Sequence, residues 1–202
     1  MHWPREVKRA FKAAVEAAGS HDNQFPGAYN KMLHALFSCK SSYVVTPNYL
    51  PALDAYGSSE IVISYEVYIR DGPVLVLQVR PPWHLYIRSQ RAAADRQLTQ
   101  RMLDIKGSSP VVCDFYGISA MGTKLCFYTC DFEEDTLSPA PVPATTVAVD
   151  TAPRSRWNED VLRSSARRRL RLLVKAIEDG LLSSSSSDSC PSEASSGSGS
   201  WS

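Results

Sequence analysis

Apolar and polar residues follow two different spacings along this chain, and each spacing predicts a different kind of element. Residues 4–18 and 29–37 carry apolar side chains every three to four positions, which predicts two amphipathic helices. Pro4 suits a first helical turn and Gly19 suits a helix end, so both ends of the first helix are marked. The β-branched run 43–45 then predicts a short strand that ends before Pro47.

The middle of the chain predicts a β-hairpin. Residues 61–69 and 74–79 are dense in β-branched and aromatic residues, and Asp71-Gly72 between them is a strong turn signal. Pro81-Pro82 closes the second strand because proline has no N–H to donate to a neighbouring strand. The hairpin is therefore the best-defined element of the pattern.

The later part alternates helices and strands. The pattern predicts, in order, a helix over 85–103, strands at 111–113 and 124–128 around a turn, an extended loop over 133–153 and a helix capped by Asn158. Serine dominates residues 183–202, a composition that cannot repay the entropy of ordering, so we expect a disordered tail.

This order of elements predicts one domain of the α/β or α+β class, with a central mixed β-sheet flanked by helices. We expect an N-terminal helix within 1–20, a main domain over 21–182 that includes the last helix, and the tail over 183–202.

Composition narrows the class of protein. Hydrophobic residues make up 44% of the chain, and 22 basic residues nearly balance 21 acidic ones, which is typical of a globular domain. The longest apolar run is too short for a membrane span, and charges interrupt the N-terminal segment where a signal peptide needs an apolar core. Five scattered cysteines fit a reducing compartment, so we expect an intracellular protein, cytoplasmic or nuclear.

The last helix carries a cationic stripe. Its four members recur every four residues, and they are Arg163, Arg167, Arg171 and Lys175. Residues at this spacing share one face of a helix. Such a face suits the phosphate backbone of DNA or RNA or an acidic protein partner, and many charged faces are merely solvated.

Several blocks of the sequence resemble a known family. They include Ser59-Glu60-Ile61-Val62, residues 73–82, residues 116–128 and Arg156-Trp157-Asn158. On these blocks, residues 25–180 resemble the PD-(D/E)xK nuclease superfamily, and more narrowly an uncharacterised group of fungal, mushroom-type proteins placed in it.

The resemblance implies a site on the hairpin. Glu60 stands where the superfamily has its strand Asp, Gln78 where it has Glu, and Arg80 where it has Lys. In an active enzyme Glu60 and Gln78 would hold Mg²⁺ or Mn²⁺ through oxygen atoms, as hard cations prefer. Glutamine lacks one negative charge, and a guanidinium cannot share a proton with an attacking water as a lysine can.

The register of the hairpin bears on this site. A strict two-residue turn would put Glu60 on the opposite face from Gln78 and Arg80, whereas a three-residue loop would align all three. Glu66 and Asp54 are reserve carboxylates outside the matching position.

The helix after the hairpin has its own candidates. Arg91 and Asp95 stand four apart, as in a helix-stabilising pair, and Arg91 near the helix start is also a candidate nucleic-acid contact. In RecB-type relatives a Gln-x-x-x-Tyr motif on this helix helps to hold the site. Here Gln97 is followed four residues later by Arg101.

Three functional hypotheses follow. The first is a nuclease-like domain with a degenerate metal site that binds nucleic acid or another partner. The second is an active Mg²⁺- or Mn²⁺-dependent nuclease that uses Glu60, Gln78 and Arg80. The third is a structural module that binds an acidic protein through the cationic stripe.

Overall fold

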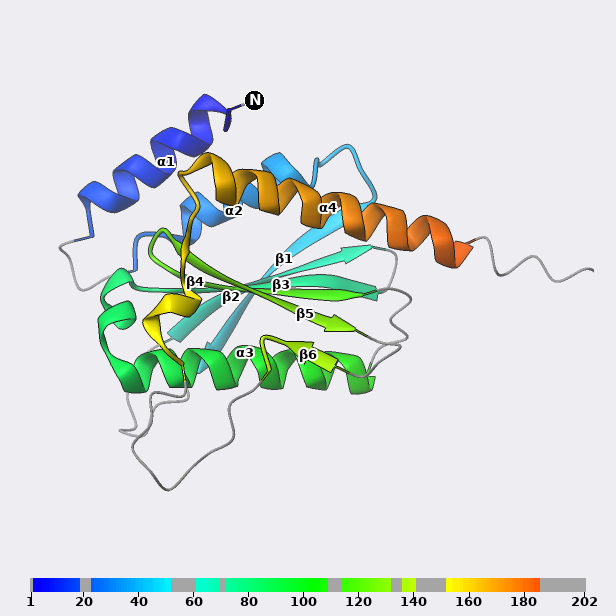
Figure 1. The fold of residues 1–202 in the computed structure, drawn as a ribbon. Helices are drawn as coiled ribbons and strands as arrows, with labels where there is room; N and C mark the ends of the chain where they lie inside the picture. The colour runs from blue at the N-terminus through cyan, green and yellow to red at the C-terminus, as the bar shows by residue number, and fades with distance from the viewer. Residues whose placement is uncertain are drawn as a thin grey trace, which may run out of the picture.

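The computed structural model describes residues 2–18, 23–51, 61–69, 72–108, 114–131, 136–140 and 152–185. These form a mixed β-sheet with helices on both faces (Figure 1). The expected α+β architecture with a central mixed sheet is therefore confirmed. In the described ranges no helix has an apolar stretch of the length needed to traverse a bilayer.

In the described residues the sheet has seven strands, in the order β1-β2-β3-β4-β5-β6, with the short β7 beside β5. Their bounds are β1 Tyr43–Pro51, β2 Ile61–Ile69, β3 Gly72–Arg80, β4 Phe115–Met121, β5 Lys124–Asp131, β6 Thr136–Ser138 and β7 Glu159–Asp160. Only the β3–β4 pair is parallel among these, and the chain makes that crossover through η1 Pro82–Tyr86 and α3 Arg88–Ser108.

Both predicted N-terminal helices form, as α1 Arg5–Glu16 and α2 Pro26–Leu36, although α2 begins before its predicted start at residue 29. Phe11 of α1 and Tyr29 of α2 meet edge to face in the core, with ring centroids 5.0 Å apart. The indole of Trp3 donates to the carbonyl of Val161 over 2.8 Å, which ties the N-terminal segment to the start of the last helix.

Strand β1 is longer than predicted, since it continues through Pro47 to Pro51. The prediction that Pro47 ends the strand was wrong because β1 lies at the edge of the sheet, where a missing N–H costs no hydrogen bond on the open side.

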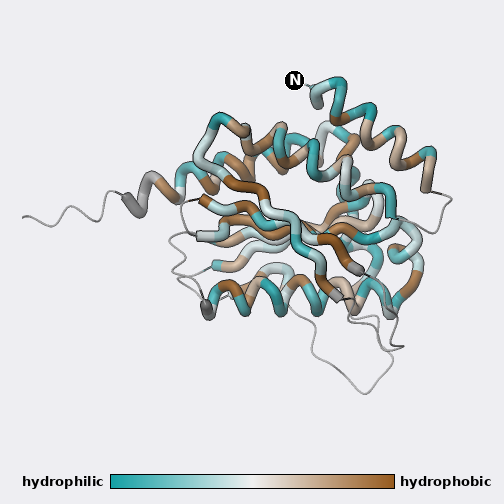
Figure 2. Tube along the Cα trace, turned by 180° about the vertical axis from the view of Figure 1, so that it is seen from behind, coloured by the Kyte–Doolittle hydropathy of each residue, from teal (hydrophilic) through white to brown (hydrophobic). Residues whose placement is uncertain are grey.

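Helices cover the two faces of the sheet unequally. One face packs on α1, α2 and α4 Ser164–Ser185, and its core includes Phe11, Leu33, Leu77 and Leu170. The other face packs on α3 through residues such as Leu98 and Met102. Figure 2 shows hydrophobic strands between these two helical layers.

Small residues let α3 lie close to the sheet. A Cβ built on Gly117 of β4 would lie 2.4 Å from the sulfur of Met102. The sequence pattern did not predict β4, because Gly117, Ser119 and Ala120 have weak strand propensity. These residues are extended because β4 is buried between β3 and β5. The strand expected at 111–113 lies outside the described residues.

Two predicted helix boundaries were wrong. Leu85 belongs to η1, and the following Ile87 is extended, so α3 begins at Arg88. Asn158 does not cap the last helix, because Glu159–Asp160 first pairs with β5 and the helix begins at Ser164. That helix runs to Ser185, three residues into the expected tail, and residues 186–202 lie outside the described part.

Candidate functional site

Gln78 and Arg80 lie side by side on the α3 face of the central strand β3. They are two residues apart, so both side chains project from the same face of the strand. Both are interior, with 2% and 1% of their surface exposed. The sequence prediction that they share a face therefore holds, and that face is covered by α3.

One residue of α3 contacts both of them. The Oε1 atom of Gln97 accepts a hydrogen bond from Nε2 of Gln78 over 2.9 Å and another from Nη2 of Arg80. Nη1 of Arg80 also donates to Oε1 of Gln90 over 3.5 Å. Gln90 was not among the predicted residues, although it stands seven residues before Gln97, a spacing that places both on one helix face.

The hairpin has the two-residue connection of one predicted alternative and the aligned register of the other. Ile69 pairs with Gly72, so two residues connect the strands, and a bulge between Val67 and Tyr68 then shifts the register. As a result Ser64 lies opposite Gln78, and the even-numbered residues of β2 share the face of Gln78. Glu60 lies outside the described residues, so its own position stays a prediction.

Among the described residues of this layer, Gln78 and Arg80 are poor groups for holding a divalent cation. Within the described part, Oε1 of Gln78 and Oγ of Ser64 are buried oxygen atoms with no hydrogen-bond partner. Gln78 contributes no charge, and the neighbouring Arg80 guanidinium repels a cation. Across the described ranges no three His, Cys, Asp or Glu side chains converge as metal ligands. Metal binding by Glu60 and Gln78 thus stays a prediction.

The reserve carboxylate Glu66 has structural partners. It is 1% exposed, its Oε1 atom accepts from Nε of Arg101 over 2.8 Å, and its Oε2 atom accepts from the Tyr68 hydroxyl. Burial, followed by this hydrogen bond, raises the pKa of Tyr68 to about 12. The hydrogen bond to Glu66 also raises the pKa of Arg101. This carboxylate therefore connects β2 to α3.

Asp95 connects α3 to strand β5 and to the segment before α4. Its Oδ1 atom accepts from the Tyr128 hydroxyl over 2.7 Å and from Nη1 of Arg156 over 2.7 Å. Burial, with a further contribution from the nearby Cys126 and Asp95, raises the pKa of Tyr128. The pair of Asp95 with Arg91 stays a prediction, and the described partners of Asp95, Tyr128 and Arg156, come from distant segments that no local spacing reveals.

Arg91 is an interior residue with 6% of its surface exposed. Its Nε atom donates to the carbonyl of Ala152 over 2.8 Å, and its Nη1 atom donates to the carbonyl of Leu85 over 2.9 Å. This arrangement gives Arg91 a positioning role between η1 and the segment before α4. Contact between Arg91 and nucleic acid remains a prediction.

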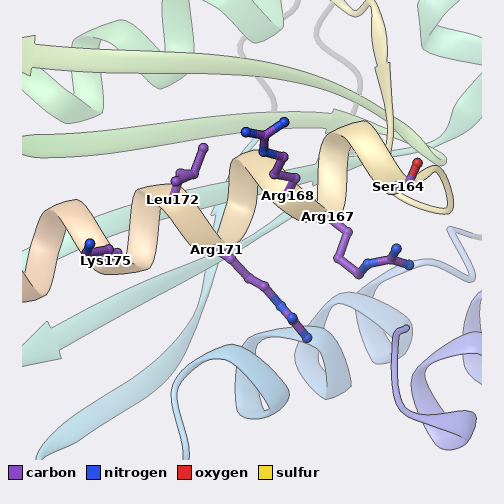
Figure 3. A pocket seen from close by; sticks show the side chains of 6 residues that line it. All are labelled: Ser164, Arg167, Arg168, Arg171, Leu172 and Lys175. Atoms are coloured by element: carbon purple, nitrogen blue, oxygen red, sulfur yellow. The ribbon is translucent and has the colours of Figure 1, made fainter. Parts of the chain in front are cut away.

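Three residues of the cationic stripe, Arg167, Arg171 and Lys175, lie on α4, on the other side of the sheet from Arg80. An open hollow there is lined by Ser164, Arg167, Arg168, Arg171, Leu172 and Lys175 (Figure 3). Arg171 reaches toward α2 and Arg168 extends from another side of the helix. Arg163 precedes the helix, where its carbonyl accepts from the Arg167 N–H over 3.3 Å, and it does not line the hollow.

The positive charge also continues around α4. The guanidinium carbon of Arg169 lies 4.3 Å from the centre of the Phe127 ring on β5. This is a cation–π contact, which fixes one face of that arginine. Arg168 thus lines the hollow together with stripe residues, whereas Arg169 lies against Phe127.

Comparison with known proteins gives no match: no family model, no curated protein and no solved structure is significantly similar to this chain.

Proposed function

We propose that this chain is a PD-(D/E)xK-like domain whose metal site is degenerate and which binds nucleic acid without cleaving it. The observation that carries the proposal is the buried contact of Gln78 and Arg80 with Gln97. The two strand residues stand at the Glu and Lys positions of the family motif. Gln97 comes from the helix that carries the site-supporting glutamine in RecB-type relatives.

The chemistry of these residues favours loss of catalysis. A phosphodiester nuclease of this kind needs anionic oxygens to hold a divalent cation. Gln78 supplies a neutral carboxamide, and the Arg80 guanidinium is protonated at every physiological pH. Gln97 accepts hydrogen bonds from both, so the cluster supports packing between β3 and α3.

The positions of the charged surfaces also favour binding without cleavage. Leu170 and Ile177 of α4 pack in the core on one face of the sheet, whereas Leu98 and Met102 of α3 pack on the other. A nucleic acid bound along α4 is therefore separated by the sheet from Arg80. Binding on α4 does not bring a phosphodiester bond to the nuclease-like residues.

Basic residues on α4 suit a phosphate backbone. Arg168 and Lys175 are exposed, and Arg167 and Arg171 are half-buried beside them. Contacts of this kind release counterions from the nucleic acid, so affinity falls steeply with salt concentration. They do not read base sequence, and the proposed binding by α4 is accordingly nonspecific.

The test measures binding and cleavage together. Electrophoretic shift with DNA and RNA, single- and double-stranded, is recorded from 25 to 300 mM salt, and cleavage is followed in Mg²⁺ and Mn²⁺. We expect salt-dependent binding that the double substitution Arg168→Glu/Lys175→Glu lowers at least tenfold. The matched control Arg5→Glu/Arg96→Glu makes the same charge change at exposed residues of α1 and α3 and should lower it far less.

Two results would replace the proposal. Metal-dependent cleavage that disappears in Glu60→Ala would establish an active nuclease. Absence of nucleic-acid binding even at 25 mM salt would leave the acidic protein partner as the better hypothesis for α4.

A further inference from the structure

Two large aromatic rings are exposed on the short helix η1. Trp83 is 42% exposed and Tyr86 is 67% exposed, while Leu85 between them is buried. In a 3-10 helix, residues three apart lie above one another, so the two rings project from the same side of η1. Two exposed rings on one side of a helix offer flat faces on which a planar ligand can stack.

The backbone beneath these rings is held firmly. Gly122 adopts φ of +61°, and a Cβ on it would lie 2.6 Å from the Cβ of Pro82, so the β4–β5 turn presses on the first residue of η1. The Arg91 guanidinium holds the far end of η1 through the Leu85 carbonyl. A preformed surface loses little entropy on binding, which favours affinity.

The surface around the rings is positively charged. The guanidinium carbon of Arg154 lies 4.4 Å from the centre of the Tyr86 ring, within cation–π range. Of the four arginines in residues 82–91 and 152–158, Arg88 and Arg154 are exposed, whereas Arg91 is buried and Arg156 is paired with Asp95. The segment that bears Arg154 contacts η1 at Tyr86 and continues through β7 to α4 (Figure 1).

Aromatic rings beside arginines match the chemistry of unpaired bases. Every base has a flat π face that stacks on an aromatic ring or a guanidinium, and each base brings a phosphate that arginine attracts. In a duplex the base faces are already covered by their neighbours. Protein interfaces also use Trp, Tyr and Arg, but the exposed Arg88 and Arg154 near the rings favour a polyanion.

We propose that Trp83, Tyr86 and Arg154 form a stacking platform for the unpaired bases of single-stranded nucleic acid. This inference rests on the proposed nucleic-acid binding and adds to it a preference for single strands. The α4 surface supplies contacts to phosphates that any strand can satisfy. The η1 platform supplies contacts that require accessible bases.

The experiment distinguishes contacts with bases from contacts with phosphates. Fluorescence anisotropy measures the affinity of the full-length protein for three probes: a 12-nucleotide oligothymidine, an abasic strand of the same length and charge, and a 12-base-pair duplex. We expect oligothymidine to bind at least tenfold tighter than the abasic strand. Trp83→Ala and Tyr86→Ala should each weaken oligothymidine binding about tenfold and leave abasic binding within twofold.

Tyr49→Ala is the matched control, because it removes a ring that is 69% exposed on the distant edge strand β1. It should change none of the three affinities. Tyr86→Ala alone suffices if Trp83→Ala unfolds, since the Tyr86 side chain is mostly in solvent.

Equal affinity for oligothymidine and the abasic strand, unchanged in both ring variants, would overturn the platform while leaving α4 binding intact. That pattern is also the one expected if the rings bind a protein. Failure of all three probes to bind at low salt would overturn the proposed function and the platform together.

Discussion

Arg80 on β3 and Gln97 on α3 stand 17 positions apart in the chain and are joined by a hydrogen bond from the guanidinium Nη2 to the carboxamide oxygen. The same oxygen accepts from Gln78, so one helix residue satisfies two donors of a central strand. Two further polar contacts of α3 reach other strands, from Asp95 to Tyr128 on β5 and from Arg101 to Glu66 on β2. Polar contacts thus fix α3 across the sheet.

Replacing Gln97 by alanine removes the acceptor that serves two buried donors. A buried donor left without its partner costs about 1–3 kcal/mol, so we expect Gln97→Ala to lower the free energy of unfolding by about 3 kcal/mol. Urea denaturation followed by circular dichroism measures this change. Gln100→Ala is the matched control on the same helix, because Gln100 is exposed and donates only to the neighbouring Asp104 in the described contacts. A loss as small in Gln97→Ala as in Gln100→Ala would contradict the arrangement.

The sequence predicts the elements of this cluster better than their connections. Period-two alternation places Gln78 and Arg80 on one face, and helical spacing places Gln90 and Gln97 on another. Neither pattern says that the two faces meet. The meeting of the two faces depends on the crossover from β3 to β4. It also depends on β4 itself, whose Gly117 and Ala120 have weak strand propensity and are extended because they are buried.

Local signals also fail where tertiary context outweighs them. Pro47 is typical of a strand end, yet it is tolerated because β1 is the edge strand among the strands that the structure describes. The hairpin register could not be derived from Asp71-Gly72 alone, because the bulge beside Val67 lies four residues before the turn. Asn158 is typical of a helix cap, but the residues that follow it form β7. Asp160 of β7 is bound to Lys124 of β5 before the helix starts.

Gly122 is the position where a methyl group should be most costly. Its φ of +61° disfavours any residue with a Cβ, and that Cβ would lie 2.6 Å from Pro82. The residue also donates its N–H to the Arg80 carbonyl and accepts from the Tyr29 hydroxyl over 2.7 Å. We expect Gly122→Ala to lower the melting temperature by an amount equivalent to about 2 kcal/mol or more.

Gly27→Ala provides the comparison. A Cβ on Gly27 in the first turn of α2 would meet no atom within 4 Å. Alanine there restricts the unfolded chain and should leave stability unchanged or raise it by up to about 1 kcal/mol. Equal effects at the two glycines would show that the turn does not press on Pro82.

The Tyr68–Glu66 contact should make stability fall in alkali. The pKa of Tyr68 is raised from its ordinary value of 10.0 to about 12, so the folded state retains the phenolic proton longer than the unfolded state. Its contribution to stability is complete below pH 10 and is lost as the pH rises toward 12. We expect the free energy of unfolding of the wild type to decline more steeply over this window than that of Tyr68→Phe. Identical slopes in urea titrations at pH 9 to 12 would contradict the assignment.

Cys39 and Cys126 should differ sharply in reactivity. Cys39 is exposed, whereas Cys126 on β5 is buried with 3% of its surface accessible. Burial raises the pKa of the Cys126 thiol from 9.0 to about 11, although a hydrogen bond with Tyr128 partly opposes the rise. At pH 8 only about one Cys126 in a thousand is then the reactive thiolate, and its sulfur is also shielded. Alkylation with iodoacetamide, read by peptide mass spectrometry, should label Cys39 at least a hundredfold faster than Cys126 in the native protein. In 6 M urea the two rates should converge, and convergence without denaturant would mean that β5 is open to solvent.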